Sequence, residues 1–389
     1  MTAPACRAPP PATYARGVAL LFEPLTLRGT TFRNRAWLPP MCQYSAVDGV
    51  PNDWHLVHLG ARAVGGFGLV IAEATSVVPE GRITPHDAGL WNDEQAEAWS
   101  RIVDVVHARG ARVGVQLQHA GRKASVFRPF HEGDGTVPVT AGGWTTVAPS
   151  PVPFPGLAEP VALSDEQVAA IPAAFAAAAT RALEAGFDTV ELHAAHGYLL
   201  HQFLSPLSNL RTDRWGGTPE NRARLLVATT DAVRAVWPDD RPLLVRLSAT
   251  DWAEGGLTVD DVAAVAAVLR EHGVDLIDVS TGGNVPVPVP VAPGYQVPAA
   301  RRVREVSGLP VAAVGLITDG AQAEAVLAEG SADAVLVGRA ALFDPSWPLR
   351  AAHELGVPTP ALAFVGADAR VLPGEPTGWP VQYERGSWN

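Results

Sequence analysis

Residues 189–198 read TVELHAAHGY, and this stretch decides how the rest of the chain is interpreted. Its apolar and β-branched residues predict a buried strand over 189–193. His193, His196 and Tyr198 follow where that strand must end, because Gly197 interrupts it. Polar side chains gathered where a buried strand ends are typical of an active site at the carboxyl edge of parallel strands.

The same arrangement, a short strand followed by a longer amphipathic and Ala-rich stretch, recurs from residue 35 to residue 356. Most of the short runs are continuously apolar, as strands buried on both faces should be. Asn92, Ser164 and Thr218 begin helices between them, and glycines stand where helices should end. The predicted strands are 35–39, 69–75, 112–118, 189–193, 243–248, 276–280, 310–314 and 334–337.

Eight strand–helix units predict an α/β fold, a TIM (β/α)8 barrel with a capping insertion after the third strand. The insertion is placed at residues 122–163, which are rich in Pro and Gly and would cover part of the barrel mouth. A doubly wound sheet would produce the same alternation and stays open as the alternative. Residues 1–18 contain three consecutive prolines and no apolar segment, so we expect a disordered tail.

Composition narrows the function. The chain has 389 residues, 47% of them hydrophobic, and a formal net charge of −11, which argues against nucleic-acid binding. No run of about 20 apolar residues predicts a membrane span. Two cysteines, Cys6 and Cys42, are too few for a disulfide framework, a zinc finger or an iron–sulfur cluster. A reducing, cytoplasmic location is expected.

Nearly every predicted strand brings a polar group or a glycine to its carboxyl end, for which a purely structural protein would have no reason. A lone glycine pair is a weak signal, but glycine and arginine after the seventh and eighth strands stand where this fold binds phosphate. The groups are Pro39, Pro40, Met41, Cys42 and Tyr44 after the first strand, Ala74 in the second, Gln116 in the third with Lys123 beyond it, Arg246 in the fifth, Gly315 after the seventh, and Gly338 with Arg339 after the eighth.

His193 and His196 admit three interpretations. They could share a zinc ion, but no further Cys or His at a familiar spacing completes a ligand set, so no metal is expected. They could be core histidines with satisfied hydrogen bonds. The favoured role is a pair of hydrogen-bond donors to an oxygen that gains negative charge. Beside such a pair, Tyr198 is interpreted as a general acid rather than a half-buried aromatic.

Gln116 and Arg246 suit the edge of a polar heterocycle, although either could be a structural hydrogen bond at the barrel mouth. The chain has no G-x-G-x-x-G after a strand, no Walker A lysine motif and no G-x-S-x-G elbow. A Rossmann dinucleotide domain, a P-loop NTPase and an α/β-hydrolase therefore each lack their usual signature.

Several motifs, in the correct order, resemble the Old Yellow Enzyme family over about residues 20–350 and again in the C-terminal tail. Cys42, two residues before Tyr44, resembles the thermophilic-like class of that family, which includes bacterial NADPH dehydrogenases and xenobiotic reductases. The matching motifs are Pro40–Tyr44, Gln116–Lys123, His193–Tyr198, Ser205–Asn209, Arg211–Asp213 and Trp215–Arg222.

The resemblance implies an FMN-dependent ene-reductase. Cys42 would contact the isoalloxazine and tune its potential, a buried inert cysteine being the alternative. Tyr44, Lys123, His193, His196 and Tyr198 would line the substrate pocket. The FMN ligands would be Pro39, Pro40, Met41, Cys42, Ala74, Gln116, Arg246, Gly315, Gly338 and Arg339.

The resemblance also implies a division of the chain into a barrel over 19–363 and a tail over 364–389. Arg385 in that tail would reach the active site of a neighbouring subunit, which predicts a homodimer or a higher even homo-oligomer. The loop over 284–298 is unusually rich in proline and is not among the matching motifs, so the substrate profile on that side is not implied.

The implied reaction passes a hydride from NADPH, or NADH, through FMN to the β-carbon of an enone or enal. His193 and His196 would bind the carbonyl oxygen, and Tyr198 would protonate the α-carbon. Two other classes stay open. One is a non-redox aldolase or isomerase acting on a phosphorylated substrate, with Lys123 as a Schiff-base lysine. The other is a non-catalytic binding barrel, which the polar strand ends argue against.

Overall fold

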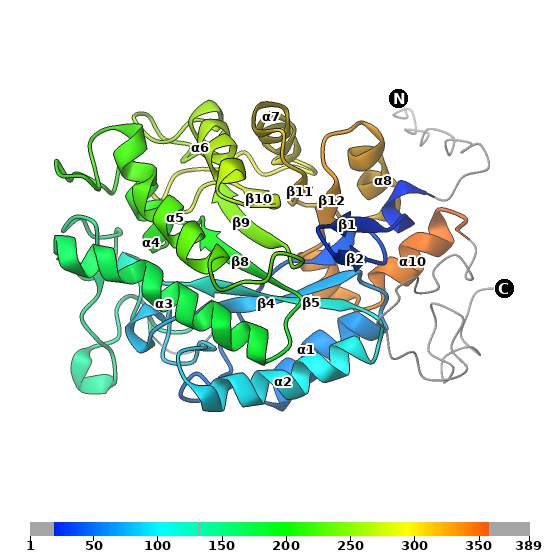
Figure 1. Ribbon diagram of the computed structural model, residues 1–389, viewed down its shortest axis with the longest axis horizontal. Coiled ribbons are helices and arrows are strands. Elements are labelled where there is room, and N and C mark those ends of the chain that lie inside the picture. Colours follow the sequence, from blue (N-terminus) through cyan, green and yellow to red (C-terminus); the bar gives the residue numbers. More distant parts are fainter. Residues whose placement is uncertain (1–18, 131–132, 358–389) are drawn as a thin grey trace, which may run out of the picture.

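The computed structural model describes residues 19–130 and 133–357, and its parallel strands close into a barrel (Figure 1). The strands follow the chain around the ring, and the last pairs with the first, Val335 opposite Ala36. This closure confirms the TIM barrel and excludes the doubly wound sheet. The barrel strands are β3 (Ala36–Leu38), β4 (Leu69–Ser76), β5 (Arg112–Gln118), β8 (Thr189–Ala194), β9 (Leu243–Ser248), β10 (Leu276–Ser280), β11 (Val311–Ala313) and β12 (Ala334–Leu336), each within one residue of its predicted bounds.

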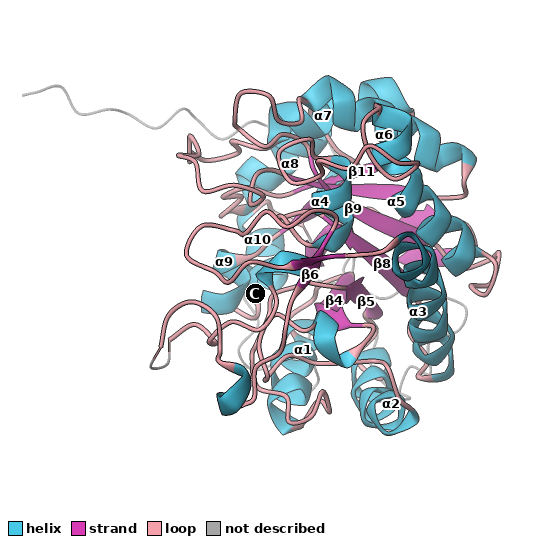
Figure 2. Cartoon of the chain, turned by 90° about the vertical axis from the view of Figure 1, so that its left-hand side faces the viewer, coloured by secondary structure: helices cyan, strands magenta, loops and turns pink. Residues whose placement is uncertain are grey.

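The helices surround the strands, as Figure 2 shows, and three begin at the predicted caps. The Ser164 hydroxyl of α3 accepts from the Gln167 N–H at 3.2 Å, and the Gln167 side chain accepts from the Ser164 N–H at 2.8 Å. Such reciprocal caps satisfy N–H groups that a helix start leaves open. The helices are α1 (Asp53–Val64), α2 (Asp93–His107), α3 (Asp165–Glu184), α4 (Leu199–Leu204), α5 (Pro219–Arg234), α6 (Val259–Glu271), α7 (Val297–Ser307), α8 (Gly320–Ala328), α9 (Arg339–Phe343) and α10 (Trp347–Glu354).

The amino-terminal half of the barrel interior is apolar and is closed by a hairpin that we did not predict. Strands β1 (Leu25–Leu27) and β2 (Thr30–Phe32) pair antiparallel. Leu27 and Phe32 belong to the same buried cluster as the inward-facing Trp37, and the rings of Phe32 and Trp37 lie 4.8 Å apart. The hairpin therefore plugs this end of the barrel and leaves only the opposite end for a site.

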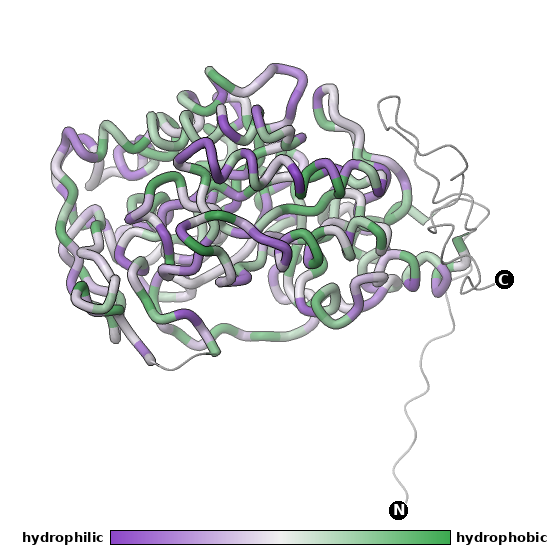
Figure 3. Tube along the Cα trace, turned by 90° about the horizontal axis from the view of Figure 1, so that it is seen from below, coloured by the Kyte–Doolittle hydropathy of each residue, from purple (hydrophilic) through white to green (hydrophobic). Residues whose placement is uncertain are grey.

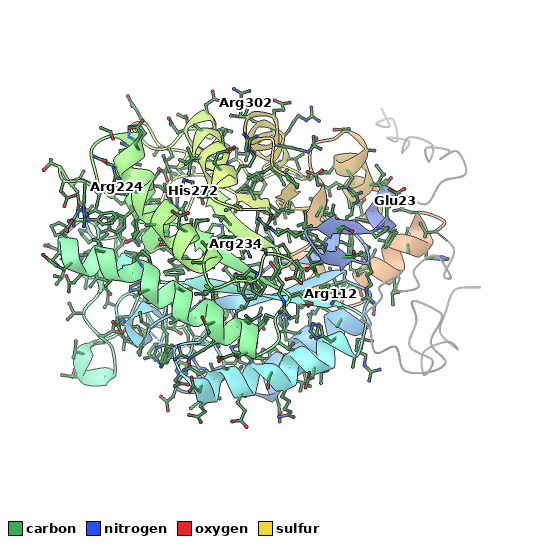
Figure 4. The ribbon with its side chains drawn as sticks, in the orientation of Figure 1. Glu23, Arg112, Arg224, Arg234, His272 and Arg302 are labelled. Atoms are coloured by element: carbon green, nitrogen blue, oxygen red, sulfur yellow. The ribbon has the colours of Figure 1, made fainter. Side chains whose placement is uncertain are left out.

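The outer surface carries the polar residues of the amphipathic helices. In Figure 3 the outer parts of the chain change between hydrophilic and hydrophobic within short stretches, as expected for helices with one buried face. Charged side chains such as Arg302 of α7 project outward (Figure 4). Arg302 pairs with Asp260 of α6, and both side chains are about half exposed or more, at 49% and 73%. No helix in the described ranges is both long and apolar enough to cross a membrane.

A different kind of ion pair lies at the amino end of the barrel. Asp188, just before β8, accepts hydrogen bonds from the Arg112 guanidinium at 3.0 Å, from the Val113 N–H at 2.8 Å and contacts His107 Nε2 at 2.7 Å. Asp188 is only 10% exposed, so these bonds are poorly screened by water. This carboxylate therefore joins the start of β5 to α2 and to the turn that begins β8.

The segment between β5 and α3 includes β6. It lies at the carboxyl ends of the barrel strands, on the same side as α4 (Figure 2). It contains the short helices Gly121–Lys123 and Val139–Ala141 and one parallel pair, β6 (Val147–Ala148) with β7 (Val161–Ala162). The described residues within 122–163, where we placed the insertion, therefore contain little regular structure.

Candidate active site

The residues predicted for the site converge at the carboxyl end of the barrel, because parallel strands all end there. Cys42, Tyr44, Ala74 and Tyr198 come from the ends of β3, β4 and β8 and pack in one apolar cluster. His193 faces Arg246 across the β8–β9 pairing. Positions more than 150 residues apart in the chain thus line one opening.

The two histidines are in direct contact. His193 Nε2 lies 3.4 Å from His196 Nδ1, and the rings are nearly perpendicular, with centroids 5.1 Å apart. Burial and the nearby charge of Arg246 lower the pKa of both imidazoles well below the usual value. Both rings are therefore neutral at physiological pH, so each carries one N–H donor and one acceptor nitrogen.

The turn after β8 holds His196 in a strained conformation. His196 has a φ of +56°, in the left-handed region that β-carbons disfavour. Its N–H donates to the Ser248 hydroxyl at 3.0 Å, which in turn donates to the Gly282 carbonyl at 2.8 Å. A β-carbon on Gly197 would lie 2.3 Å from the Gly283 carbonyl oxygen. The turns after β8 and β10 therefore pack backbone against backbone, and glycine is required between them.

Lys123 joins those two turns. Its ammonium donates to the carbonyl oxygens of His196 at 2.8 Å and Gly283 at 3.0 Å. It also lies 5.0 Å from the centre of the Tyr198 ring and 4.8 Å from that of Phe154. Burial, with the charge of Arg122, lowers the pKa of Lys123 to about 8. Two of its three donors are thus used within the protein.

Tyr198 and Cys42 keep their protons. Burial raises the pKa of the Tyr198 phenol well above its usual value, and the negative charge of Asp87 acts in the same direction. Burial, Asp87 and Glu73 likewise raise the pKa of the Cys42 thiol. Cys42 is therefore a neutral thiol rather than a thiolate nucleophile, and Tyr198 is a phenol with a proton available to donate.

Beneath the histidines lies a layer of four buried polar side chains. The Gln116 amide donates to Glu191 Oε1 at 2.7 Å, and Arg246 Nε lies 2.9 Å from Asp278 Oδ2. Both carboxyls lie near the charge of Arg246, and both are buried. Burial and the neighbouring carboxyl raise the pKa of Glu191 to about 8, and burial raises that of Asp278 to about 6.

A family model matches residues 20–357, and its description is the NADH:flavin oxidoreductase / NADH oxidase family. The match covers most of the chain and all eight barrel strands. The chain belongs to this family.

Relatives in this flavin oxidoreductase family extend over nearly the whole chain. An NADPH dehydrogenase of Geobacillus thermodenitrificans is 46% identical over 370 residues, covering 94% of this chain and 98% of the relative. The Bacillus subtilis NADPH dehydrogenase is 44% identical over 369 residues with the same coverage. An old yellow enzyme homologue from Zymomonas mobilis has a TM-score of 0.73 and 30% identity, covering 86% of this chain and 92% of that structure. Morphinone reductase has a TM-score of 0.72 and 29% identity, covering 89% and 92%.

The protein is accordingly an FMN-dependent NAD(P)H oxidoreductase of the Old Yellow Enzyme type. Its own residues fit the flavin ring. No hydrogen bond within the described ranges involves the terminal nitrogens of the Arg246 guanidinium or the Gln116 carbonyl oxygen, although both side chains are buried. A donor from β9 and an acceptor from β5 that are both left for another partner match the polar edge of a flavin ring.

The ends of β11 and β12 fit a phosphate. Gly315 has a φ of +127°, and a β-carbon there would crowd the Gln296 side chain at 3.1 Å. Arg339 is exposed, and it forms no ion pair with any described carboxylate. Gly338 lies close to Pro39 and Met41, so the loop after β3 borders the same place. These glycines and Arg339 leave room and charge for an anion.

The loop that carries Cys42 is fixed by a residue that our sequence interpretation did not assign to the site. Glu73, in β4, accepts from the Gln43 N–H at 2.8 Å, and its other oxygen lies 2.8 Å from His55 Nε2 of α1. Glu73 thus joins α1, β4 and the cysteine loop. No group of three or more His, Cys, Asp or Glu side chains in the described part of the chain is arranged to hold a metal ion.

Other missed residues are Glu191, Asp278, Ser280 and Gln296. Side chains alternate between the two faces of a strand, and Glu191 stands two residues before His193 in β8. Glu191 therefore points to the same face as His193, which could have indicated it as a site residue. Gln296 lies at the end of the proline-rich loop, whose middle is exposed while its ends, Asn284 and Gln296, are buried. Arg385, which the resemblance places in a neighbouring active site, lies outside the described residues.

Proposed function

We propose that this oxidoreductase is an ene-reductase that reduces the carbon–carbon double bond of enones and enals. The observation that carries the proposal is the His193–His196 pair, two neutral imidazoles with nitrogens 3.4 Å apart, above the buried Gln116–Glu191 and Arg246–Asp278 pairs. Two such nitrogens can donate to one oxygen, and donors placed where negative charge develops stabilise the transition state.

FMN, when bound, supplies to the β-carbon the hydride that it has accepted from NAD(P)H. The names of the relatives support NADPH as the donor. His193 and His196 hold the substrate carbonyl oxygen and draw electron density from the β-carbon. Tyr198 gives its phenolic proton to the α-carbon, so that one hydride and one proton saturate the double bond. The Tyr198 ring lies 5.0 Å from the His193 ring, within reach of the same small substrate.

The remaining site assignments follow from the same arrangement. Cys42 and Tyr44 provide an apolar wall. The Cys42 thiol would contact the flavin there and tune its potential. Lys123 keeps one N–H free for substrate beyond the two that bind the backbone. The FMN ligands are Pro39, Pro40, Met41, Cys42, Ala74, Gln116, Arg246, Gly315, Gly338 and Arg339.

The first experiment is the visible absorption spectrum of the purified protein. A yellow protein that bleaches with NADPH under anaerobic conditions, and recovers its colour when cyclohexenone is added, would support the proposal. A yellow protein that bleaches but does not recover with any enone would overturn the alkene as acceptor.

Variants test the individual roles. Because an oxyanion donor is typically worth about 10²–10³ in rate, His193→Ala and His196→Ala should each slow reoxidation by enone by that factor. Normal turnover in both variants would refute the donor role. Tyr198→Phe should slow reoxidation by enone more than reduction by NADPH, and the reverse order would reject Tyr198 as the acid.

We further propose that the barrel over 19–363 works in a homodimer or higher even homo-oligomer, to which the tail over 364–389 contributes Arg385. The basis is the resemblance of the tail motif, since these residues lie outside the described ranges. Deletion of residues 380–389 should raise the KM for enone while leaving FMN bound. Unchanged kinetics would exclude the shared site.

A further inference from the structure

The turn that carries His196 and Tyr198 has an uncommon backbone shape. The Tyr198 N–H donates to the carbonyl of Ala195 at 3.2 Å, which closes a four-residue β-turn. The two central residues, His196 and Gly197, have φ angles of +56° and +73°. Positive φ at both central positions is typical of a type I′ turn. The central peptide, with the His196 C=O and the Gly197 N–H, makes no bond inside such a turn and needs partners elsewhere.

Two side chains hold this central peptide, one at each end. Lys123 Nζ donates to the His196 carbonyl at 2.8 Å, and the Gly197 N–H donates to Nδ1 of His201 at 2.9 Å. His201 lies in α4 and is fully buried, and Gly197 is buried as well. Solvent therefore offers the Gly197 N–H no alternative acceptor, and the bond to His201 is its route to a partner.

Asp251, after β9, supports the same protonation of His201. A backbone N–H can only donate, so Nδ1 of His201 carries no proton and the ring proton is on Nε2. Nε2 lies 3.1 Å from Oδ1 of Asp251. Oδ2 of that carboxylate accepts from the Ser205 hydroxyl at 2.6 Å and from the Leu257 N–H at 2.9 Å. Burial raises the pKa of Asp251, but its contacts with His201, Ser205 and Leu257 outweigh burial and lower it, so the charged carboxylate favours the proton on Nε2.

The two partners fit the peptide in one orientation only. Rotating it by about half a turn would convert type I′ into type II′, in which Gly197 no longer has a positive φ. The rotated carbonyl oxygen would face Nδ1 of His201, which has no hydrogen to donate. The rotated N–H would face the ammonium of Lys123, which has no lone pair to accept it. One donor and one acceptor therefore hold His196 and Gly197 in the left-handed region.

We propose that His201 is a positioning residue, which holds the Gly197 N–H and so fixes the turn from which His196 and Tyr198 reach the substrate. This inference rests on the proposed function of those two side chains. His201 is fully enclosed by protein, so it contacts neither substrate nor flavin itself. It acts through the central peptide, with Lys123 at the other end.

Two substitutions separate the two contacts of His201. His201→Asn keeps an oxygen near the position of Nδ1, which can accept from Gly197, but no group reaches Asp251. His201→Gln keeps an N–H near the position of Nε2, which can donate to Asp251, but the Gly197 N–H loses its acceptor. The asparagine variant should keep its rate of reoxidation by enone within about threefold, and the glutamine variant should lose at least about tenfold. The urea midpoint should nevertheless fall more for asparagine, because a buried carboxylate loses a partner.

The Gly197 amide can also be observed selectively in the FMN-loaded, oxidised enzyme. The dipeptide His–Gly occurs at 196–197 and at 272–273, so protein with ¹³C-carbonyl histidine and ¹⁵N-glycine gives two HNCO signals. His272→Gln identifies the second signal, which is the internal reference. In the native enzyme the Gly197 amide should exchange slowly with D₂O. His201→Gln should speed this exchange about tenfold or more, and His201→Asn should keep it within about threefold.

Rapid exchange of the Gly197 amide in the native enzyme would overturn the proposal without any variant. A glutamine variant that keeps either slow exchange or the native rate of reoxidation would also overturn it, as would two variants whose rates follow their urea midpoints. A native enzyme with a protected Gly197 amide that no enone reoxidises would instead overturn the proposed function, and His201 would still hold the turn. The two failures are therefore distinguishable.

Discussion

The ammonium nitrogen of Lys123 lies 2.8 Å from the carbonyl oxygen of His196, and Lys123 is the one lysine in the 389-residue chain. The other cationic side chains that could replace it are arginines, whose planar guanidinium is larger and binds in a fork. A compact ammonium fits between two carbonyl oxygens and two aromatic rings. This contact ties the strained turn after β8 to the neighbouring turn after β10.

Because Lys123 is the one lysine of the chain, its titration can be followed by NMR without assigning the signal. Protein labelled with ¹⁵N-lysine should give one amine signal with a midpoint near the lowered pKa of about 8, against 10.5 for an exposed lysine. The unfolded chain binds more protons than the folded chain between these two values. The contribution of Lys123 to the free energy of unfolding should therefore rise with pH in that window. A midpoint near 10.5 would contradict the buried arrangement.

Gly197→Ala should disable the site. Its β-carbon would lie 2.3 Å from the Gly283 carbonyl oxygen, and its φ is +73°. The turn must shift to relieve the clash, which displaces His196 and Tyr198, so reoxidation by cyclohexenone should fall at least about 10²-fold. The measurement is stopped-flow flavin reoxidation.

Gly330→Ala is the control for that variant. Gly330 has a similar φ of +67°, but no atom lies within 4 Å of an added β-carbon. It should lose only the backbone penalty of about 1 kcal/mol in urea unfolding and keep its reoxidation rate. Equal kinetic losses in both variants would show that backbone strain, and not the contact with Gly283, matters.

Asp188→Ala should reduce stability without altering catalysis. The change leaves Arg112, His107 and the Val113 N–H without their partner at the amino end of the barrel, far from the reacting groups. We expect a loss of about 2–3 kcal/mol in the free energy of unfolding, measured with urea. Asp260→Ala removes the exposed partner of Arg302 and should cost less than about 1 kcal/mol. Equal losses in the free energy of unfolding for the two variants would mean that the burial of Asp188 does not strengthen its interactions.

Glu191→Gln should change how stability depends on pH. The pKa of Glu191 is raised to about 8, so the folded chain retains a proton that the unfolded chain releases above about pH 4.5. The contribution of Glu191 to the free energy of unfolding therefore falls as the pH rises from about 4.5 to about 8. Urea unfolding at about pH 6.5 and about pH 8.5 should show a smaller decrease for the glutamine variant than for the native protein. A larger decrease would mean that the native carboxylate is stabilised by Arg246 after all.

The barrel could be predicted because each strand is a short apolar run buried on both faces and separated from the next by a capped helix. The β1–β2 hairpin was missed, although Arg28 and Gly29 stand between two short runs rich in β-favouring residues, Leu25–Leu27 and Thr30–Phe32, which is a hairpin pattern. Its strands have three residues each, and their partner is the interior of the barrel. Strands this short form because they pack against the barrel interior, and the sequence alone does not show that contact.

The site was predictable where the chemistry is concentrated in one motif, as in residues 193–198. It was not predictable where a partner comes from another strand. Asp278 and Ser280 are both buried in β10, and the sequence alone gives no reason to pair either with Arg246 or His196. Gln296 was hidden in a loop whose prolines pointed to an irregular surface segment. Such pairings depend on strand order around the ring.

The pairing of β12 with β3 has a consequence for how this protein is made. Ala36 leaves the ribosome about 300 residues before Val335, the residue that it faces in the ring. Throughout that interval the nascent chain carries an apolar strand with one unpaired edge, which is a template for association with another chain. Closure must therefore wait for nearly complete synthesis, and a chain that stalls before β12 exposes its first strand.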